Sequence, residues 1–169
     1  MRVRTALTRT ARFAYAFGIV VAFGCSSASA QASQQGDPGD VQIRAEKGDA
    51  NAQYSLGLMY GRGEGVPKDF AKAIDWYIKA AEQGHALAQF NLGLIYKHGA
   101  GVPKDPAKAV EWYTKAAEQG NVQAQSSLGF MYQNGEGVPK SSVRAVKWFT
   151  KAAEQGDTRL CLTDRLYGF

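Results

Sequence analysis

The sequence predicts an all-α fold, a solenoid of three antiparallel helix pairs. The segment KAAEQG occurs at residues 79–84, 115–120 and 151–156, always 36 residues apart. Small and apolar residues recur at helical spacing within each copy, and a Gly- and Pro-rich segment divides each copy into two halves. A fixed period of this length indicates a repeat array, in which each helix pair stacks on the next.

Three copies, residues 45–80, 81–116 and 117–152, align without a gap. The first half of each copy carries Ala, Leu and Tyr four residues apart, which places them on one helix face. A Gly follows each Leu, although Gly inside a helix costs about 1 kcal/mol relative to Ala. We therefore expect another helix to pack closely at this Gly. The positions are Ala52, Leu56, Gly57 and Tyr60; Ala88, Leu92, Gly93 and Tyr96; and Ala124, Leu128, Gly129 and Tyr132.

The second half of each copy is a second predicted helix, with Ala, Trp and Ala at i, i+3 and i+7. We expect this face in the core, with Trp112 of the middle copy as a large buried aromatic. The helix begins at a capping Asp or Ser after the loops GRGEGVPKD, HGAGVPKD and NGEGVPKS, and it ends at a Gly. The core positions are Ala73, Trp76 and Ala80; Ala109, Trp112 and Ala116; and Ala145, Trp148 and Ala152. The boundaries are Asp69, Asp105 and Ser141, and Gly84, Gly120 and Gly156.

The apolar faces at the two ends of the array must be covered by other residues, because three repeats are about the minimum for a stable stack. We assign the solenoid to residues 41–156. Residues 41–45, VQIRA, are expected to be the tail of an earlier second helix that covers the first copy. Residues 157–169 begin like a fourth copy but then diverge, and we expect them to form a C-terminal cap.

The N-terminus predicts export. Residues 1–30 contain a basic region, the apolar run FAYAFGIVVAFG and an Ala28-Ser29-Ala30 cleavage site, the three parts of a signal peptide. Residues 31–40 read as a flexible linker. We expect a periplasmic or secreted protein; lipidation at Cys25 is the alternative and would anchor the chain to a membrane.

Charge and cysteine content exclude several classes of function. Residues 1–30 hold four of the 20 Lys and Arg and none of the 15 Asp and Glu, so the remaining chain has a net charge of +1. Such a chain has no basic stripe for nucleic acid or for an anionic membrane. Cys161 would be the only cysteine after cleavage, which excludes a disulfide framework and a Cys-rich metal site.

The pattern AQYSLGLMYGRGEGVPKDFAKAIDWYIKAAEQG resembles the Sel-one-like repeat, a relative of the tetratricopeptide repeat. The resemblance covers residues 45–156 and includes the LGxxY element and the GxGVPKD loop. It implies a right-handed solenoid that acts as an adaptor or regulatory binding surface. Exported bacterial members of the family are associated with regulation, envelope processes or host contact. A cysteine-rich subgroup is linked to β-lactam binding, but this chain lacks its cysteines.

Catalytic chemistry has little support in this sequence. A hydrolase needs a nucleophile with a positioned base, and the chain holds two histidines, His85 and His98, on different predicted elements. His85 is expected at a helix start and His98 on the surface, so neither forms a metal site. The Gly-rich loops lack the spacing of a phosphate-binding loop. We therefore expect no enzyme, no metal and no cofactor.

A partner-binding face is the functional prediction. The side of each first helix opposite Ala, Leu and Tyr differs between copies, and in tetratricopeptide proteins it lines the concave groove. The predicted binding residues are Asn51, Tyr54, Leu58 and Arg62; Leu87, Phe90, Leu94, Lys97 and His98; and Gln123, Ser126, Phe130 and Asn134. Exposed apolar groups there would mark an interaction site. Alternatively, Leu58, Leu94 and Phe130 pack against neighbouring helices.

The prediction for the whole chain is therefore an exported, non-enzymatic module that binds a peptide or protein segment on its concave surface. Its partner would be neither nucleic acid nor a small-molecule substrate. The alternative is a cell-envelope enzyme that acts on peptidoglycan or a β-lactam. The scarcity of candidate bases and nucleophiles favours the binding module.

Overall fold

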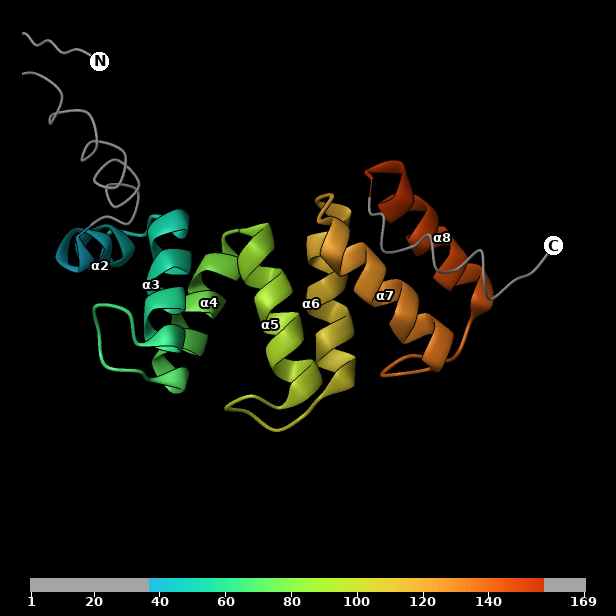
Figure 1. Cartoon of the computed structure of the whole chain (residues 1–169), viewed down its shortest axis with the longest axis horizontal. Helices are drawn as coiled ribbons and strands as arrows, with labels where there is room; N and C mark the ends of the chain where they lie inside the picture. Colours follow the sequence, from blue (N-terminus) through green and yellow to red (C-terminus); the bar gives the residue numbers. More distant parts are fainter. Residues whose placement is uncertain (1–36, 157–169) are drawn as a thin grey trace, which may run out of the picture. The chain divides into compact units, whose positions relative to one another are not determined.

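A computed structural model describes residues 37–156, in which every regular element is an α-helix (Figure 1). The described helices stand side by side in sequence order, and each packs against its neighbours along the chain. This arrangement confirms the predicted all-α repeat solenoid. The helices are α2 (Pro38–Glu46), α3 (Ala50–Arg62), α4 (Phe70–Glu82), α5 (Ala86–His98), α6 (Pro106–Glu118), α7 (Val122–Asn134) and α8 (Ser142–Glu154).

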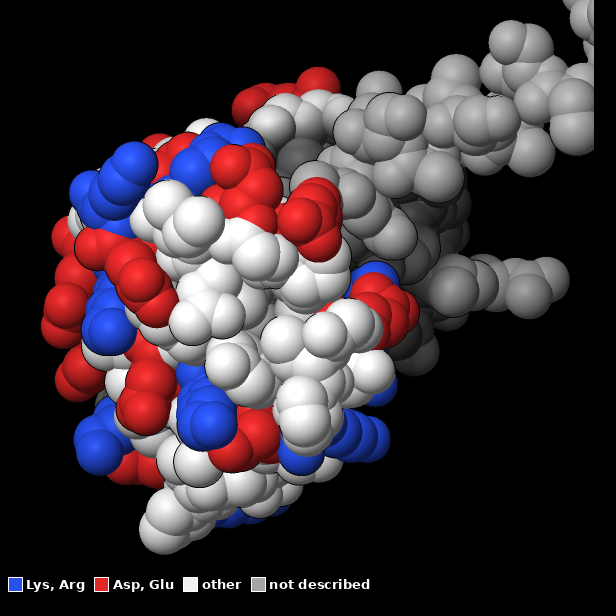
Figure 2. Space-filling model, turned by 90° about the vertical axis from the view of Figure 1, so that its left-hand side faces the viewer, with Lys and Arg blue, Asp and Glu red and all other residues white. Residues whose placement is uncertain are grey.

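Charges of both signs are intermingled on the face that carries α2 (Figure 2). No helix in residues 37–156 is long and apolar enough to cross a membrane. The predicted signal peptide, residues 1–30, and the predicted cap, residues 157–169, lie outside the described part of the chain.

The glycine of each first helix lies under an aromatic ring of the second helix. A Cβ on Gly57 would lie 2.7 Å from Cδ1 of Tyr77, closer than real Cβ atoms approach a neighbour. Gly93 faces Tyr113 in the same way, and Gly129 faces Phe149 on α8. The expected close approach of two helices at this glycine is therefore confirmed.

The tryptophans lie at the margin of the core, which corrects the expectation that Trp112 is a large buried aromatic. Trp112 is half-buried, and the ammonium of Lys115 lies 4.2 Å from the centre of its ring. The next residue, Tyr113, is fully buried together with Leu128 and Met131. Trp and Tyr are adjacent in sequence, so the rotation of the helix decides which ring enters the core, and helical spacing alone does not determine that rotation.

A ladder of buried glutamines connects successive copies. Gln89 Nε2 donates to the backbone oxygen of Ala81 at 3.0 Å, and Gln89 Oε1 accepts from Gln119 Nε2 at 2.6 Å. The same two bonds occur in the other copies through Gln53 with Ala45 and Gln83, and through Gln125 with Ala117 and Gln155. The second-to-last residue of KAAEQG thus satisfies a buried amide as well as lying next to the helix stop.

The loops between the helices of a pair close in the same way in each copy. The amide of Asp69 donates to the oxygen of Tyr60 at 2.9 Å, and the amide of Asp105 donates to the oxygen of Tyr96 at 2.8 Å. Side-chain oxygens of Asp69, Asp105 and Ser141 then cap α4, α6 and α8. Gly84 takes the left-handed conformation after α4 with φ of +86°. The sequence predicted both kinds of boundary.

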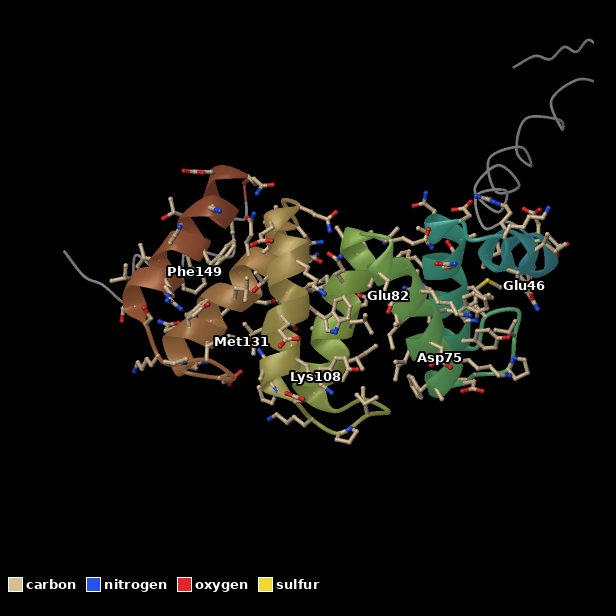
Figure 3. All side chains as sticks on the ribbon, turned by 180° about the vertical axis from the view of Figure 1, so that it is seen from behind. Glu46, Asp75, Glu82, Lys108, Met131 and Phe149 are labelled. Atoms are coloured by element: carbon tan, nitrogen blue, oxygen red, sulfur yellow. The ribbon has the colours of Figure 1, made fainter. Side chains whose placement is uncertain are left out.

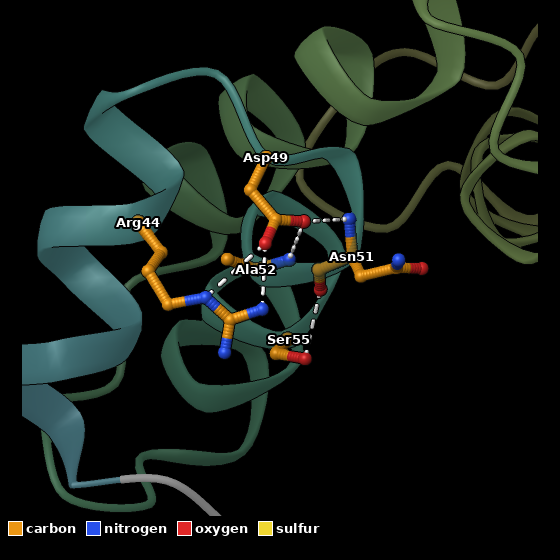
Figure 4. Close-up of polar contacts among 5 residues, drawn as sticks. All are labelled: Arg44, Asp49, Asn51, Ala52 and Ser55. Atoms are coloured by element: carbon orange, nitrogen blue, oxygen red, sulfur yellow. Dashed lines mark hydrogen bonds and ion pairs between the residues drawn. The ribbon is translucent and has the colours of Figure 1, made fainter.

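The first copy is covered by α2. Val41 and Ala45 are buried against Ala52 and Leu56 of α3, in the place that a preceding second helix would take. Figure 4 shows the polar contacts at this junction. Arg44 donates from Nε and Nη2 to Asp49, at 3.1 and 2.6 Å, and the other carboxylate oxygen of Asp49 caps α3. Hydrogen bonds from Arg44 lower the pKa of Asp49.

The beginning of α2 differs from the expected domain boundary. This helix begins at Pro38, inside the segment 31–40 that reads as a linker. Proline is favoured in the first turn of a helix, since its missing N–H would have no intrahelical partner there. The Pro-Gly pair that suggests a turn in the sequence therefore starts a helix instead.

Candidate functional site

An open cavity of about 250 Å³ lies where α3, α4 and α5 meet. Its walls are mainly apolar, and three residues of the predicted binding face, Leu58, Arg62 and Leu94, contribute to them. The lining residues are Leu58, Gly61 and Arg62 of α3; Phe70, Ala73, Ile74 and Tyr77 of α4; Asn91, Leu94 and Ile95 of α5; and Ala100 of the following loop.

The cavity is open because small residues occupy two positions of its wall. Gly61 and Ala100 correspond to Lys97 and Glu136 one repeat later. At that second junction the ammonium of Lys97 lies 3.7 Å from a carboxylate oxygen of Glu136, so two long side chains stand where the first junction has a hydrogen and a methyl group. The two junctions therefore differ in open volume where their wall residues differ in size.

The lining of the cavity includes polar groups from two helices. Tyr77 and Asn91 both line it, and burial raises the pKa of the Tyr77 hydroxyl to about 12. Tyr77 therefore stays neutral at physiological pH. The hydroxyl of Tyr77 and the amide of Asn91 can form hydrogen bonds with a ligand in the cavity.

The other apolar residues of the predicted face lean on their own copy's second helix or on the next copy. The rings of Phe90 and Tyr113 are 5.7 Å apart, and those of Phe130 and Phe149 are 5.0 Å apart. Tyr54 stacks on His85 at 4.6 Å. Leu58 packs against the cluster of α4 and α5, so the alternative of packing between helices describes much of this surface.

The remaining predicted residues are mostly solvent-facing or polar. Ser126 Oγ donates to the backbone oxygen of Val122 at 3.1 Å, and Lys97 is paired with Glu136. The exposed residues of the predicted face are Asn51, Arg62, Leu87, His98, Gln123, Phe130 and Asn134.

The first helices carry no acidic side chain. Helix α3 carries Arg62 and α5 carries Lys97 and His98 near their C-terminal ends, and α3, α5 and α7 contain neither Asp nor Glu. The acidic residues stand on second helices and loops, such as Asp75 and Glu82 on α4 (Figure 3). Arg62 reaches Glu64 of the loop at 3.7 Å, and both side chains are more than half exposed.

The two histidines have separate roles. His85 precedes α5, and its Nδ1 accepts the backbone N–H of Ala88 at 3.2 Å, which makes it the N-cap that the sequence predicted. Burial lowers the pKa of His85. His98 is exposed at the end of α5. No group of three His, Cys, Asp or Glu in residues 37–156 could hold a metal ion.

Sequence reasoning missed the part of the cavity wall that comes from outside the first helices. Phe70 and Ile74 of α4 and Ala100 of the loop line the cavity together with the predicted residues. The signal was present in the differences between copies, since Gly61 and Ala100 are small where the next copy has Lys97 and Glu136.

Comparison with solved structures finds the same architecture in three bacterial proteins. A protective antigen of uropathogenic Escherichia coli with an SLR fold superposes with a TM-score of 0.69 at 49% identity, over 70% of this chain and 26% of the antigen. A Sel1 repeat protein of Oxalobacter formigenes superposes with a TM-score of 0.68 at 39% identity, over 73% of this chain and 52% of that protein. The cysteine-rich protein B of Helicobacter pylori superposes with a TM-score of 0.61 at 26% identity, over 75% of this chain and 94% of that protein.

Two curated relatives share a shorter stretch. A Sel1-like repeat-containing protein of Acanthamoeba polyphaga mimivirus is 48% identical over 42 residues, 25% of this chain and 7% of the relative. The ERAD-associated E3 ubiquitin-protein ligase component HRD3A of Arabidopsis thaliana is 44% identical over 41 residues, 24% of this chain and 6% of the relative. The matched stretch thus spans less than a tenth of either curated relative.

A family model for the Sel1 repeat matches residues 50–85, 86–121 and 122–157. Each match begins with a first helix and ends just after the second, and the three matches follow one another without a gap. Their period is the one that KAAEQG shows, with the boundaries placed a few residues later than in the sequence analysis. These matches cover well over half of the sequence, and the chain belongs to the Sel1 repeat family.

Proposed function

We propose that this chain is a non-enzymatic interaction module that binds a peptide or protein segment on the face formed by α3 and α5. The observation that carries the proposal is the open apolar cavity at the junction of α3, α4 and α5. Exposed apolar surface of this kind is costly in water and typically serves binding. Membership of the Sel1 repeat family and the likeness to a component of a ubiquitin ligase support the same class of function.

The alternative of a cell-envelope enzyme gains no support from the described residues. A nucleophile needs a base within hydrogen-bond reach, and the Nδ1 atom of His85 is already occupied by a backbone amide. The pKa of Tyr77 is raised, which is the wrong direction for a nucleophile or a base. The mainly apolar lining of the cavity favours binding over catalysis.

The chain itself supplies a substitution that closes the cavity. Gly61→Lys with Ala100→Glu copies Lys97 and Glu136 from the next junction, where those side chains already fit the fold. A Cβ on Gly61 meets its nearest neighbour, the Tyr77 hydroxyl, at an ordinary 3.8 Å. The double variant should fold normally, because replacing a helical Gly also favours the helix by about 1 kcal/mol.

The test is selection of ligands from a displayed peptide library on the purified chain. We expect enriched peptides to bind the wild type and to lose at least tenfold in affinity for the double variant. Thr150→Lys on α8, an exposed position away from the cavity, is the control for added charge and should bind normally. Peptides that bind all three proteins equally would overturn the cavity as the binding site.

Export is part of the same proposal and has a separate test. The tripartite sequence of residues 1–30 supports it. Expression of the full chain in a Gram-negative host, followed by mass spectrometry of the periplasmic fraction, should give an N-terminus at Gln31. A lipid-modified Cys25 in the membrane fraction would favour the anchored form instead.

A further inference from the structure

We infer that the cavity between α3, α4 and α5 takes one bulky apolar side chain of a peptide segment, and that Arg62 at its rim binds a carboxylate of the same segment. This inference rests on the proposed function and names the chemistry of the partner. It follows from the size of the cavity, its lining and the distribution of charge around it.

The size of the cavity indicates a single side chain. Pockets for cofactors and small-molecule substrates typically measure about 300–1,000 Å³. The volume of about 250 Å³ lies below that range. The lining by Leu58, Ile74 and Leu94 favours an apolar group, since a polar group there would lose its hydrogen bonds to water. A Leu, Ile, Met or Phe anchor fits this description.

The charge around the cavity indicates an acidic partner. Arg62 is the charged residue among those that line the cavity, and none of the lining residues is acidic. A basic segment would therefore meet like charge at the cavity, whereas an acidic one would meet a guanidinium. Charge complementarity of this kind selects partners and speeds their association.

The ion pair that Arg62 forms with Glu64 does not prevent it from binding a partner carboxylate. Glu64 lies 3.7 Å away, and the two side chains are 59% and 54% exposed. An exposed ion pair of that geometry contributes little to stability. A partner carboxylate that approaches over the apolar cavity is less hydrated, and it can form the shorter bidentate contact that arginine favours. Glu64 belongs to a loop and can turn to solvent.

The spacing on α3 sets the pattern of the ligand. Leu58 in the cavity wall and Arg62 at the rim are four residues apart, which corresponds to about 6 Å along the helix. An extended peptide advances about 3.3 Å per residue and shows every second side chain to the same side. The carboxylate should therefore stand two residues from the apolar anchor, as an Asp or Glu.

The experiment is the library selection on the full chain, followed by affinity measurements with synthetic peptides. We expect selected peptides to carry an apolar residue two positions from Asp or Glu. Replacing the anchor by Ala should abolish binding, and replacing the acid by its amide should weaken it about five- to tenfold, the range of a charge-assisted contact.

A cycle with Arg62 variants isolates the charge contact. Arg62→Ala should lower the affinity for the acidic peptide by the same five- to tenfold. It should change the affinity for the amide peptide by less than twofold. Arg62→Lys should recover part of the loss, because charge remains while the bidentate geometry does not. Binding of the acidic peptide should also weaken with added salt.

The outcomes separate this inference from the proposed function. Selected peptides that need the cavity but show no acid, or that bind Arg62→Ala unchanged, overturn the acidic partner and leave the binding module standing. Peptides that carry Lys or Arg beside the anchor overturn it as well. A library with no enrichment on the wild type over the Gly61→Lys, Ala100→Glu variant overturns both.

Discussion

The ring of Tyr113 on α6 occupies the space that a side chain on Gly93 of α5 would take. Tyr113 is fully buried, so its ring has no room to move aside. The absence of a Cβ at Gly93 thus lets the two helices of a pair approach each other. The energetic consequence can be measured, because Gly61 provides a helical glycine without such a neighbour.

Gly93→Ala should destabilise the protein by about 1–3 kcal/mol, the usual cost of overpacking a filled core, despite the better helix propensity of Ala. Gly61→Ala is the matched control and should stabilise by up to about 1 kcal/mol, since its Cβ makes only ordinary contacts. Urea denaturation of both variants measures whether each substitution raises or lowers the free energy of unfolding. An equal gain in both would mean that the ring of Tyr113 yields easily.

The glutamine ladder yields a second prediction. Gln89→Leu should cost about 1–3 kcal/mol, because it leaves the oxygen of Ala81 and the amide of Gln119 without their buried partner. Gln123→Leu, at an exposed position on α7, should stay within about 0.5 kcal/mol of the wild type. The measurement is again the free energy of unfolding. A Gln89 variant as stable as the control would show that water replaces the ladder.

The sequence predicted the architecture because the repeat shows each feature three times. The 36-residue period, the Gly- and Pro-rich loop and the capping residues each depend on local chemistry. Helix pairs, their boundaries and the close approach at Gly57 follow from that chemistry without knowledge of distant contacts. The glutamines recur equally regularly, and their fixed separation of 30 residues, as between Gln53 and Gln83, was a readable signal of a buried contact.

The cavity could not be predicted in the same way. Leu58, Arg62 and Leu94 lie on the expected face, but the cavity exists because Gly61 and Ala100 leave volume beside them. Whether a small residue leaves a void or is filled by a neighbour depends on packing among three helices and a loop. The prediction that Trp112 is buried was wrong for a related reason, since one residue of helix rotation separates it from the buried Tyr113.

His85 should make stability depend on pH. Burial lowers its pKa below the usual 6.5, so the folded protein binds this proton less readily than the unfolded chain. The stabilisation is therefore fully present above about pH 6.5 and is lost as the pH falls through the folded pKa. Protonated Nδ1 can no longer accept the N–H of Ala88, and a lost cap costs about 0.5–2 kcal/mol.

The test of this dependence uses the cap of the next copy. His85→Asn copies Asn121, whose side chain accepts from Ala124, and it should keep the cap while flattening stability between about pH 7.5 and 5. Denaturation curves at several pH values decide the matter, and a slope that survives in His85→Asn would assign it to another group.

The last prediction concerns the face of α8 that no described helix covers. Val110 on α6 is 9% exposed, whereas its counterpart on α8, Val146, is 54% exposed. The side chain of Val110 is covered because α7 packs on α6, and the described residues provide no equivalent helix after α8. Val110→Ala should therefore cost about 1–3 kcal/mol, as large-to-small core substitutions do, and Val146→Ala less than about 0.5 kcal/mol.

Both free energies of unfolding should be measured on the full chain and on a chain that stops after Gly156. A substantial cost of Val146→Ala that disappears in the shortened chain would show that residues 157–169 cover α8 as the expected cap. A small cost in both chains would mean that this end of the stack stays open.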